Sequence, residues 1–304
     1  MSLVTTITQL NLKGEFKFQK KLAPLTRFKV GGAAEIFYIP YDKQELSYFL
    51  KSLPAHVPVT FIGNGSNILV SDDGLEGVVI KLGKNFASID LCQDHVYVGA
   101  AALNWKFAKI CMHNGIANFE FAEWIPGSVG GGIIMNAGSY GHEFCDSIVS
   151  VEIIDRLGNI KTLSKNDITF GYRKTSIPPS DIIVGATFAR EYKNPALIRT
   201  TMVQFYEQKK STQPIFAKTA GSTFTNPKEK KAWQYITESG SANMRIGDAI
   251  WSPHHPNFAL NQGNATFKDF ENLIFDTREK IYKKFSLTLD LEVKILGKNK
   301  LNNN

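Results

Sequence analysis

Cysteine is scarce in this sequence. Only Cys92, Cys111 and Cys145 occur among 304 residues, and none of them forms a CxxC pair or stands beside a histidine pair. A disulfide framework and a zinc site both need closely spaced ligands of that kind. We therefore expect no disulfide, no bound metal and a reducing, cytoplasmic environment.

Long apolar runs are also absent. No stretch reaches the roughly 18 apolar residues that a membrane-spanning helix needs. The first residues, MSLVTTITQLNLKGEF, lack the charged start and apolar centre of a secretory signal. The sequence therefore predicts a protein that neither enters nor binds a membrane.

The chain has few charged residues, 21% against 43% hydrophobic ones, which is a globular composition and not a disordered one. Its net charge of +7 and pI near 9.1 suit an anionic partner, either nucleic acid or a phosphorylated small molecule. The basic residues are scattered, and no basic patch is interleaved with aromatics. We expect a solvated basic surface and no nucleic-acid partner.

The order of predicted elements indicates an α+β protein. Short β-rich runs alternate with helices in the first part of the chain, and one of these helices begins at Asp42, which can cap it. The predicted strands are Glu35–Ile39, Val59–Ile62, Gly77–Leu82, Val96–Ala100, Ile148–Arg156, Ile160–Leu163 and Ile182–Arg190, and a second helix covers Trp105–Asn114.

A change in character follows a predicted helix that runs from Pro195 to about Lys210. We divide the chain there, into residues 1–195 and residues 196–304. The last part is predicted to contain helices at 229–240 and 266–285 and strands at 246–250, 258–260 and 287–296. Only the final residues, KNKLNNN, have a composition that predicts disorder.

Two glycine-rich segments can approach a phosphate-bearing ligand. Gly63-Asn64-Gly65-Ser66-Asn67 follows a predicted strand, but Ile68 stands where a dinucleotide fingerprint needs glycine, so a plain structural turn is an equal alternative. Residues 125–138, IPGSVGGGIIMNAG, contain five glycines within twelve residues. Because glycine in such density is costly to order, this segment favours close approach of the main chain to a ligand over a bland loop.

Three further positions carry polar chemistry. Arg173 follows Tyr172 and can pair with a carboxylate. Ser222 lies among small residues, where a hydroxyl is often only part of a turn. Glu292 interrupts an apolar predicted strand, so it is either exposed at an edge or buried and functional.

Taken in order, these segments resemble the UDP-N-acetylenolpyruvoylglucosamine reductase (UDP-N-acetylmuramate dehydrogenase) family. The likeness spans most of the chain and rests on TRFKVGG (26–32), GNGSNIL (63–69), IPGSVGGGIIMNAG (125–138), Tyr172-Arg173, Gln213-Pro214, AGSTFTNP (220–227), Ile246-Gly247 and LEVKILG (291–297). The short connection between Arg190 and Gln213 resembles the type II form of the family.

The resemblance implies a fold and a reaction. Residues 1–195 would be an FAD-binding part of two subdomains, of the vanillyl-alcohol-oxidase (PCMH) type, and residues 196–304 an α+β substrate-binding domain. NADPH would reduce FAD, and the hydride would then pass to the vinyl carbon of UDP-N-acetylenolpyruvoylglucosamine, giving UDP-N-acetylmuramate for peptidoglycan synthesis. A monomer acting on small molecules is expected.

Roles for individual residues follow from the same resemblance. Arg173 and a protonated Glu292 of raised pKa would stabilise the enolate, and Ser222 would supply its proton. Tyr172, Lys210 and Gln213 would bind the substrate. FAD would be held by Gly63, Asn64, Gly65, Ser66, Asn67, Ile125, Pro126, Gly127, Ser128, Gly130, Gly131, Asn136, Ala137 and Gly138.

The sequence departs from the family pattern at three places: Thr175, Ala100-Ala101 and Pro256. None of them is a proposed catalytic residue. Two other functions stay open at this point: a flavin-dependent oxidase or dehydrogenase of a small alcohol, and a basic nucleic-acid-binding protein without catalysis.

Overall fold

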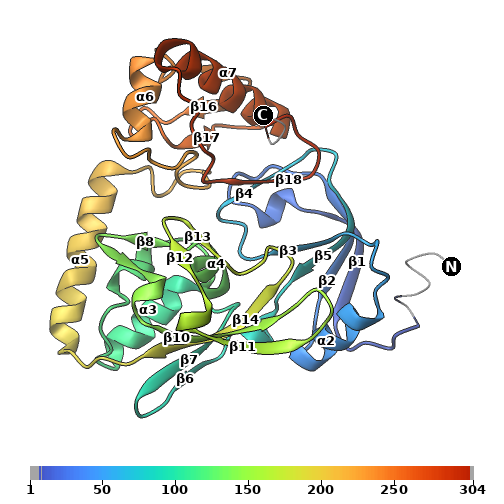
Figure 1. Cartoon of the computed structure of the whole chain (residues 1–304). Coiled ribbons are helices and arrows are strands. Elements are labelled where there is room, and N and C mark those ends of the chain that lie inside the picture. Colours follow the sequence, from blue (N-terminus) through green and yellow to red (C-terminus); the bar gives the residue numbers. More distant parts are fainter. Residues whose placement is uncertain (1–6, 8, 302–304) are drawn as a thin grey trace. The chain divides into compact units, whose positions relative to one another are not determined.

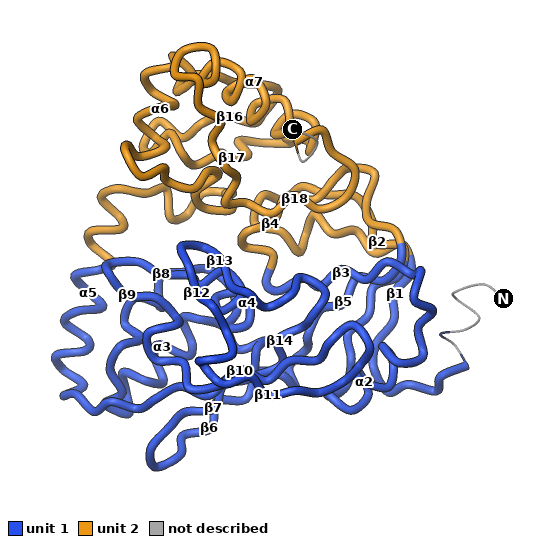
Figure 2. Tube along the Cα trace, viewed as in Figure 1, with its two compact units in different colours: residues 1–18, 36–64, 77–205 blue, residues 19–35, 65–76, 206–304 orange. Residues whose placement is uncertain are grey.

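The protein, seen in a computed structural model, is described for residue 7 and residues 9–301. It divides into two compact units (Figure 2). Unit 1 comprises residues 1–18, 36–64 and 77–205, and unit 2 comprises residues 19–35, 65–76 and 206–304. The division of the chain at residue 195, into a cofactor-binding and a substrate-binding part, stays a prediction. Of the N-terminal segment used to argue against a secretory signal, residues 1–6 and 8 lie outside the described residues.

Three strands carry the chain between the two units. They are β1 (Glu15–Lys21), β2 (Ala33–Ile39) and β5 (Leu75–Lys81), and with β3 (Val59–Ile62) they form a four-stranded sheet in the order β1-β2-β5-β3 (Figure 1). Strands β3 and β5 are parallel. Helix α2 (Lys43–Ser52) begins as predicted, because the Asp42 carboxylate accepts the Glu45 N–H at 2.8 Å.

The larger sheet of unit 1 has five antiparallel strands. Its order is β11 (Ile160–Ser164), β10 (Ile148–Ile154), β14 (Ile182–Ala189), β7 (His95–Gly99) and β6 (Ile89–Leu91). The helices of this part of the unit are α3 (Asn104–His113), α4 (Val129–Ile134) and the first half of α5 (Pro195–Thr212), with 3-10 helices η2 (Lys84–Phe86), η3 (Glu120–Trp124), η4 (Phe144–Asp146) and η5 (Lys165–Asp167).

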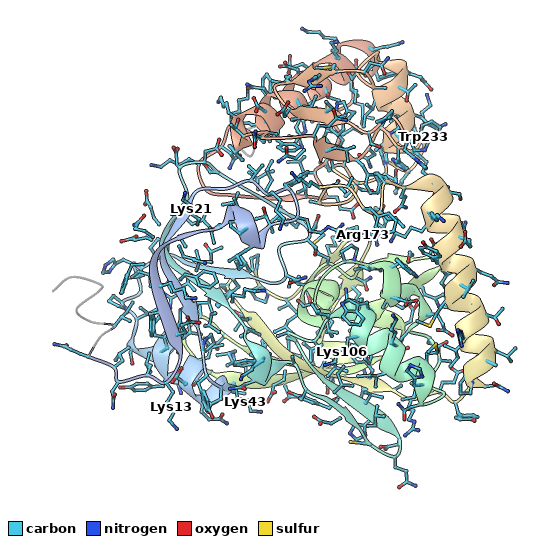
Figure 3. All side chains as sticks on the ribbon, turned by 180° about the vertical axis from the view of Figure 1, so that it is seen from behind. Lys13, Lys21, Lys43, Lys106, Arg173 and Trp233 are labelled. Carbon is cyan, nitrogen blue, oxygen red and sulfur yellow. The ribbon has the colours of Figure 1, made fainter. Side chains whose placement is uncertain are left out.

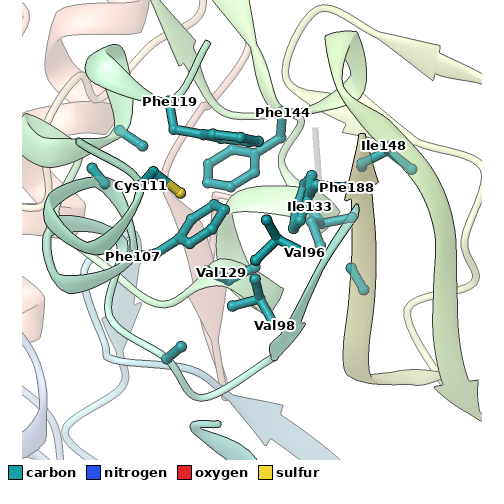
Figure 4. Packing of buried hydrophobic residues seen from close by; sticks show 14 of the residues in the cluster. Val96, Val98, Phe107, Cys111, Phe119, Val129, Ile133, Phe144, Ile148 and Phe188 are labelled. Atoms are coloured by element: carbon teal, nitrogen blue, oxygen red, sulfur yellow. The ribbon is translucent and has the colours of Figure 1, made fainter. Parts of the chain in front are cut away.

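An aromatic cluster forms the core beside this sheet (Figure 4). Phe188 on β14 lies at its centre, with ring centroids 5.4 Å from both Phe107 and Phe119 and 6.1 Å from Phe144. All four rings are buried, and Cys111 is buried among them as a free thiol. The helices α3, η3 and α4 are therefore fixed by apolar packing, since α4 is only six residues long and could not persist alone.

Unit 2 has its own core. An antiparallel sheet of β15 (Arg245–Ile246), β16 (Ala249–Trp251) and β17 (Ala259–Asn261) accompanies helices α6 (Ala232–Glu238) and α7 (Phe267–Phe285). The N-terminal insert contributes Phe28, whose ring centroid lies 4.4 Å from that of Phe270, and η1 (Ala23–Leu25). Strand β18 (Lys294–Leu296) pairs in parallel with β4 (Ile68–Val70).

Several sequence predictions were wrong in detail. β1 was not predicted, and residues 246–250 form a hairpin that turns at Gly247, not one strand. Of the predicted strand 287–296 only β18 is a strand, because the N–H groups of Glu292 and Val293 both point to one acceptor, the Thr223 carbonyl, instead of alternating along a ladder. The predicted disorder at the C-terminus fails for Lys300 and Leu301, which bond to the rest of unit 2, while residues 302–304 lie outside the described residues.

Within the described part of the chain, no helix is both long and apolar enough to cross a membrane.

We expect Phe188→Ala to lower the free energy of unfolding of unit 1 by about 3–5 kcal/mol, because it leaves a cavity among rings that cannot close in. Urea denaturation followed by near-ultraviolet circular dichroism measures the change. Tyr192→Ala, which removes a ring that is 76% exposed, is the matched control. Equal midpoints for the two variants would contradict the proposed role of this core.

Candidate functional site

The two glycine-rich segments meet at one hydroxyl in unit 1. A side-chain carbon added at Gly63, just after β3, would contact only Ser128 Oγ, at 3.1 Å. One added at Gly131 in α4 would also contact only Ser128 Oγ, at 3.6 Å. Ser128 is buried at the N-terminal end of α4, yet its side chain does not cap the helix. The main chain is thus open on both sides of a hydroxyl, which fits the FAD expected at these segments.

Lys81 was missed by the sequence analysis and lies beside the same turn. Its Nζ donates to the Gly63 carbonyl at 2.7 Å, and burial lowers its pKa. Lys81 ends β5 and is paired in register with Ile62, so it lies at the carboxyl ends of two parallel strands, where open sheets commonly bind ligands. A lysine at the end of an apolar strand was the only signal in the sequence.

Three glycines of residues 127–138 have a packing reason to be glycine, beside the approach to a ligand expected from their density. A side-chain carbon at Gly130 would lie 2.8 Å from the Ala100 side chain, one at Gly132 would lie 2.5 Å from the Phe144 ring, and one at Gly138 would lie 2.4 Å from the His142 carbonyl oxygen. Close packing inside unit 1 therefore accounts for these three, and Gly131 is the open one.

The loop that precedes α4 is held by a buried residue, Asn104. Its N–H donates to the Gly127 carbonyl and its Nδ2 to the Ile125 carbonyl, both at 3.1 Å. Asn104 Oδ1 is buried without a hydrogen-bond partner among the described residues. Because an unpaired buried acceptor costs about 1–3 kcal/mol, a donor outside this chain is expected here, on either FAD or water.

Gly65 and Asn67 of the first glycine-rich segment, residues 63–67, contact other residues of unit 2. Gly65 adopts a φ of +66° and its added side-chain carbon would lie 2.0 Å from the Leu25 carbonyl oxygen. The Asn67 side chain donates to the Glu292 carbonyl at 3.1 Å. Asn64 is exposed and Ser66 half-buried. Gly65 therefore has a structural reason to be glycine, and Asn67 lies next to a predicted catalytic residue.

Arg173 stands in a hairpin turn. Strands β12 (Phe170–Gly171) and β13 (Lys174–Thr175) pair directly, so Tyr172 and Arg173 form a two-residue turn beside α4 (Figures 1 and 3). Arg173 has a φ of +59°, which is unfavourable for a bulky residue. Its Nη2 donates to the Gly138 carbonyl at 3.0 Å, and its guanidinium lies 4.8 Å from the Tyr172 ring centroid.

A buried amide supports that turn. Asn136 is fully buried, and its Nδ2 donates to Glu143 Oε2 at 2.7 Å and to the Gly171 carbonyl at 3.2 Å. Its Oδ1 accepts the Cys145 N–H at 3.1 Å. Glu143, on the hairpin of β8 (Gly138–Ser139) and β9 (His142–Glu143), places Oε1 at 3.9 Å from Arg173 Nη1. Sequence reasoning included Asn136 but missed Glu143.

Ser222 and Glu292 lie on paired segments of unit 2. The Glu292 N–H donates to the Thr223 carbonyl at 2.9 Å, and Phe224 forms an isolated bridge with Leu291. The Ser222 and Glu292 side chains are both half-buried. Glu292 thus lies before β18 and outside any strand, so the predicted strand context gives no support for its burial. The structure therefore places the main chains of these two predicted residues on neighbouring segments.

Asn257 fixes the segment that carries Ser222. Its side-chain Oδ1 accepts the Phe224 N–H at 3.0 Å and its Nδ2 donates to the Phe224 carbonyl at 2.8 Å, while its own carbonyl accepts the Thr223 N–H at 2.7 Å. Asn257 is 2% exposed. We call these bonds of Asn257 the Ser222 clamp. The Asn257 N–H also donates to His255 Nδ1 at 3.3 Å, so His255 supports the clamp.

The predicted substrate-binding residues occupy exposed or half-buried positions. Tyr172 is 47% exposed. Lys210, near the end of α5, is exposed and places its Nζ 5.6 Å from the Tyr206 ring centroid. Gln213 follows α5, and its N–H donates to the Lys209 carbonyl at 2.9 Å. Tyr172 and Arg173 belong to unit 1, whereas Lys210, Gln213, Ser222 and Glu292 belong to unit 2.

Two protein-family models match the chain. Residues 34–164 match a model described as an FAD binding domain, and residues 213–296 match the C-terminal domain of UDP-N-acetylenolpyruvoylglucosamine reductase.

Similar proteins extend over nearly the whole chain. It is 44% identical over 287 residues to the UDP-N-acetylenolpyruvoylglucosamine reductase of Rickettsia typhi, covering 94% of this chain and 97% of that protein. It is 44% identical over 288 residues to the protein of that name from Rickettsia bellii strain RML369-C, covering 94% and 95%.

The fold is similar to a solved structure. The crystal structure of UDP-N-acetylenolpyruvylglucosamine reductase from Thermus caldophilus aligns with a TM-score of 0.82 and 30% identity, covering 94% of this chain and 100% of that one. The predicted fold class, α+β with an FAD-binding part and a distinct C-terminal domain, is confirmed.

Because His255 lies in the Ser222 clamp, we expect the stability of unit 2 to depend on its protonation. Burial lowers the pKa of His255, and the neighbouring His254 lowers it further. Below about pH 6.5 the His255 side chain is protonated in the unfolded chain but stays neutral in the folded chain. The free energy of unfolding therefore falls as the pH drops from about 6.5 to the pKa of His255 in the folded chain.

Thermal melts between pH 7.5 and pH 5.5 measure this effect. The melting temperature of His255→Gln should fall less over this range than that of the wild type. His56→Gln, at an exposed position of unit 1, is the control and should keep the wild-type slope. A His255→Gln variant with the same slope as the wild type would refute the assignment.

Proposed function

Because the chain belongs to the UDP-N-acetylenolpyruvoylglucosamine reductase family of FAD-dependent oxidoreductases, which acts in peptidoglycan precursor synthesis, we propose that it reduces UDP-N-acetylenolpyruvoylglucosamine to UDP-N-acetylmuramate with NADPH. Bound FAD would supply hydride transfer from NADPH to the terminal vinyl carbon of the substrate. The other requirements of the reaction, which are positioning, charge stabilisation and proton supply, fall to residues of this chain.

The cofactor is held, in this proposal, around the Ser128 hydroxyl. The observation that carries it is the shared opening at Gly63 and Gly131, where the main chain can approach a ligand closely on both sides of one donor. Lys81 adds a positive charge beside Gly63, which favours the diphosphate of FAD. The remaining residues of the two segments, Asn64 to Asn67, Ile125 to Gly127, Gly130 and Asn136 to Gly138, complete the binding loops.

Arg173 stabilises negative charge on the substrate. Addition of hydride to the vinyl carbon moves charge onto the carbon next to the carboxylate and onto the carboxylate itself. A guanidinium with a fixed position binds that charge more strongly in the transition state than in the substrate. Support for the role comes from the strained turn at Arg173 and from groups that fix its side chain, which include the Gly138 and Asn136 carbonyls, Glu143 and the Tyr172 ring.

Ser222 and Glu292 complete the reaction at the α-carbon. The Ser222 hydroxyl donates the proton, and Glu292, protonated, donates a hydrogen bond to the carboxylate of the enolate. Their support is the Glu292 N–H bond to the Thr223 carbonyl, which places both on paired segments of unit 2. The turn at Gly221, with a φ of +87° and open space around it, leaves room next to Ser222.

The UDP-sugar substrate is bound, in this proposal, by Lys210 and Gln213 near the start of the C-terminal part and by Tyr172 of unit 1. Lys210 is assigned to the diphosphate because it is a flexible exposed cation, and Tyr172 and Gln213 are assigned to the sugar and its substituents. We propose that the protein acts as a cytoplasmic monomer of the type II form, with residues 1–195 binding FAD and residues 196–304 binding the substrate.

Anaerobic stopped flow separates the two half-reactions. NADPH should bleach the flavin absorbance, and the enolpyruvyl sugar nucleotide should then restore it. In Ser222→Ala we expect bleaching at the wild-type rate, because Ser222 has no part in that step. Restoration should slow by about 10²–10⁴-fold, the usual loss for a missing proton donor.

Ser211→Ala, an exposed serine of the same unit, is the control and should keep both rates. Restoration by Ser222→Ala at the wild-type rate would exclude Ser222 as the donor. A wild-type flavin that the sugar nucleotide never restores, but oxygen does, would favour the oxidase reading instead.

Lys81→Met should weaken FAD binding about 10-fold or more, because it removes a charge-assisted contact worth roughly 1.5–3 kcal/mol. Titration of apoprotein with FAD, followed by flavin fluorescence, measures the dissociation constant. Lys84→Met removes an exposed lysine three residues further along and should have little effect. An unchanged dissociation constant in Lys81→Met would remove this residue from the site.

A further inference from the structure

The guanidinium of Arg173 has a carboxylate facing it that the reaction does not require. Glu143 Oε1 lies 3.9 Å from Arg173 Nη1, too far for a hydrogen bond but close enough for a direct charge interaction. The two side chains are 34% and 19% exposed. Because both are partly removed from water, this interaction is stronger than that of a pair on an open surface.

Glu143 also reaches the turn that carries Arg173, through a second route. Its Oε2 accepts the Asn136 Nδ2 at 2.7 Å, and the same nitrogen donates to the Gly171 carbonyl at 3.2 Å. Gly171 is the last residue before the two-residue turn. One carboxylate is therefore connected to Arg173 twice, by charge at the guanidinium and by hydrogen bonds at the base of its turn.

Glu143 also caps the 3-10 helix η4, and this capping role must be distinguished from its interaction with Arg173. Its side chain accepts the N–H of Asp146, and the Asp146 carboxylate accepts the N–H of Glu143 at 2.9 Å, which is a capping box for η4. A neutral amide could accept the Asp146 N–H equally well. Capping therefore does not call for a negative charge at residue 143, whereas the interaction with Arg173 does.

We propose that Glu143 is a positioning residue for Arg173: its charge fixes the guanidinium and partly neutralises it before the substrate carboxylate arrives. The proposal rests on the role given to Arg173 above. A guanidinium without this counter-charge binds the ground-state carboxylate more strongly and is less well fixed. Stronger ground-state binding lowers KM without lowering the barrier, and looser placement lowers kcat.

The test is Glu143→Gln, which keeps the size and the acceptor oxygen and removes the charge. We expect kcat to fall about 10-fold, as for a change of about 1.4 kcal/mol in the barrier, with KM for the sugar nucleotide unchanged or lower. Flavin reduction by NADPH, the dissociation constant of FAD and the melting temperature should stay at wild-type values. Asp167→Asn, which neutralises a carboxylate in the capping box of η5, is the matched control.

A double-mutant cycle decides whether Glu143 acts through Arg173. In an Arg173→Lys background, Glu143→Gln should lower kcat much less than 10-fold, because the group it positions is already altered. An equal loss in both backgrounds would overturn the proposal. So would a raised KM, or a loss of FAD affinity and melting temperature greater than that in Asp167→Asn, since either indicates a structural role.

Failure of this inference can be told from failure of the proposed function. If Arg173→Lys slows restoration of the flavin by substrate but Glu143→Gln does not, only the role of Glu143 is wrong. If Arg173→Lys itself restores the flavin at the wild-type rate, the assigned role of Arg173 is wrong, and the role of Glu143 falls with it.

Discussion

The buried side chain of Asn136 bonds to two other segments of unit 1, residues 143–145 and the β12–β13 hairpin, and the geometry around Arg173 depends on it. It bonds to Glu143, to the Gly171 carbonyl and to the Cys145 N–H, and is itself fully buried. An amide can satisfy donors and acceptors at once, which neither a carboxylate nor a hydroxyl does in the same directions. Loss of any one partner leaves a buried polar group unpaired, so the arrangement is fixed as a whole.

Unit 2 uses the same device at a different place. Asn257, also buried, bonds to both backbone groups of Phe224 and accepts the Thr223 N–H through its own carbonyl. The segment with Ser222 lies outside the three-stranded sheet and is paired through isolated bridges, Ser222 with Phe258 and Phe224 with Leu291, instead of a continuous ladder. In each unit, then, a proposed catalytic side chain stands in a turn or outside the main sheets, and a buried asparagine bonds to the backbone beside it.

The glycines divide into those that the packing needs and those that leave space. A side-chain carbon added at Gly130, Gly132 or Gly138 would lie too close to other parts of unit 1, whereas one added at Gly63 or Gly131 would contact only Ser128 Oγ. The first group lets the short helix α4 approach the aromatic core, and that packing in turn holds Gly131 and Ser128 in place. Packing and ligand access are therefore served by neighbouring residues of one motif.

The amino-acid pattern alone was sufficient for the α+β class, the cap at Asp42, the positions of most long helices and strands, and the family whose motifs the chain carries. These depend on local preferences and on apolar spacing, which a sequence displays directly. It also placed Asn136, Arg173, Ser222 and Glu292 among the site candidates, through resemblance. It could not separate packing glycines from open ones, and it missed Lys81 and Glu143. Their importance comes from partners 18 and 30 residues away, Gly63 and Arg173, which only the folded chain brings into contact.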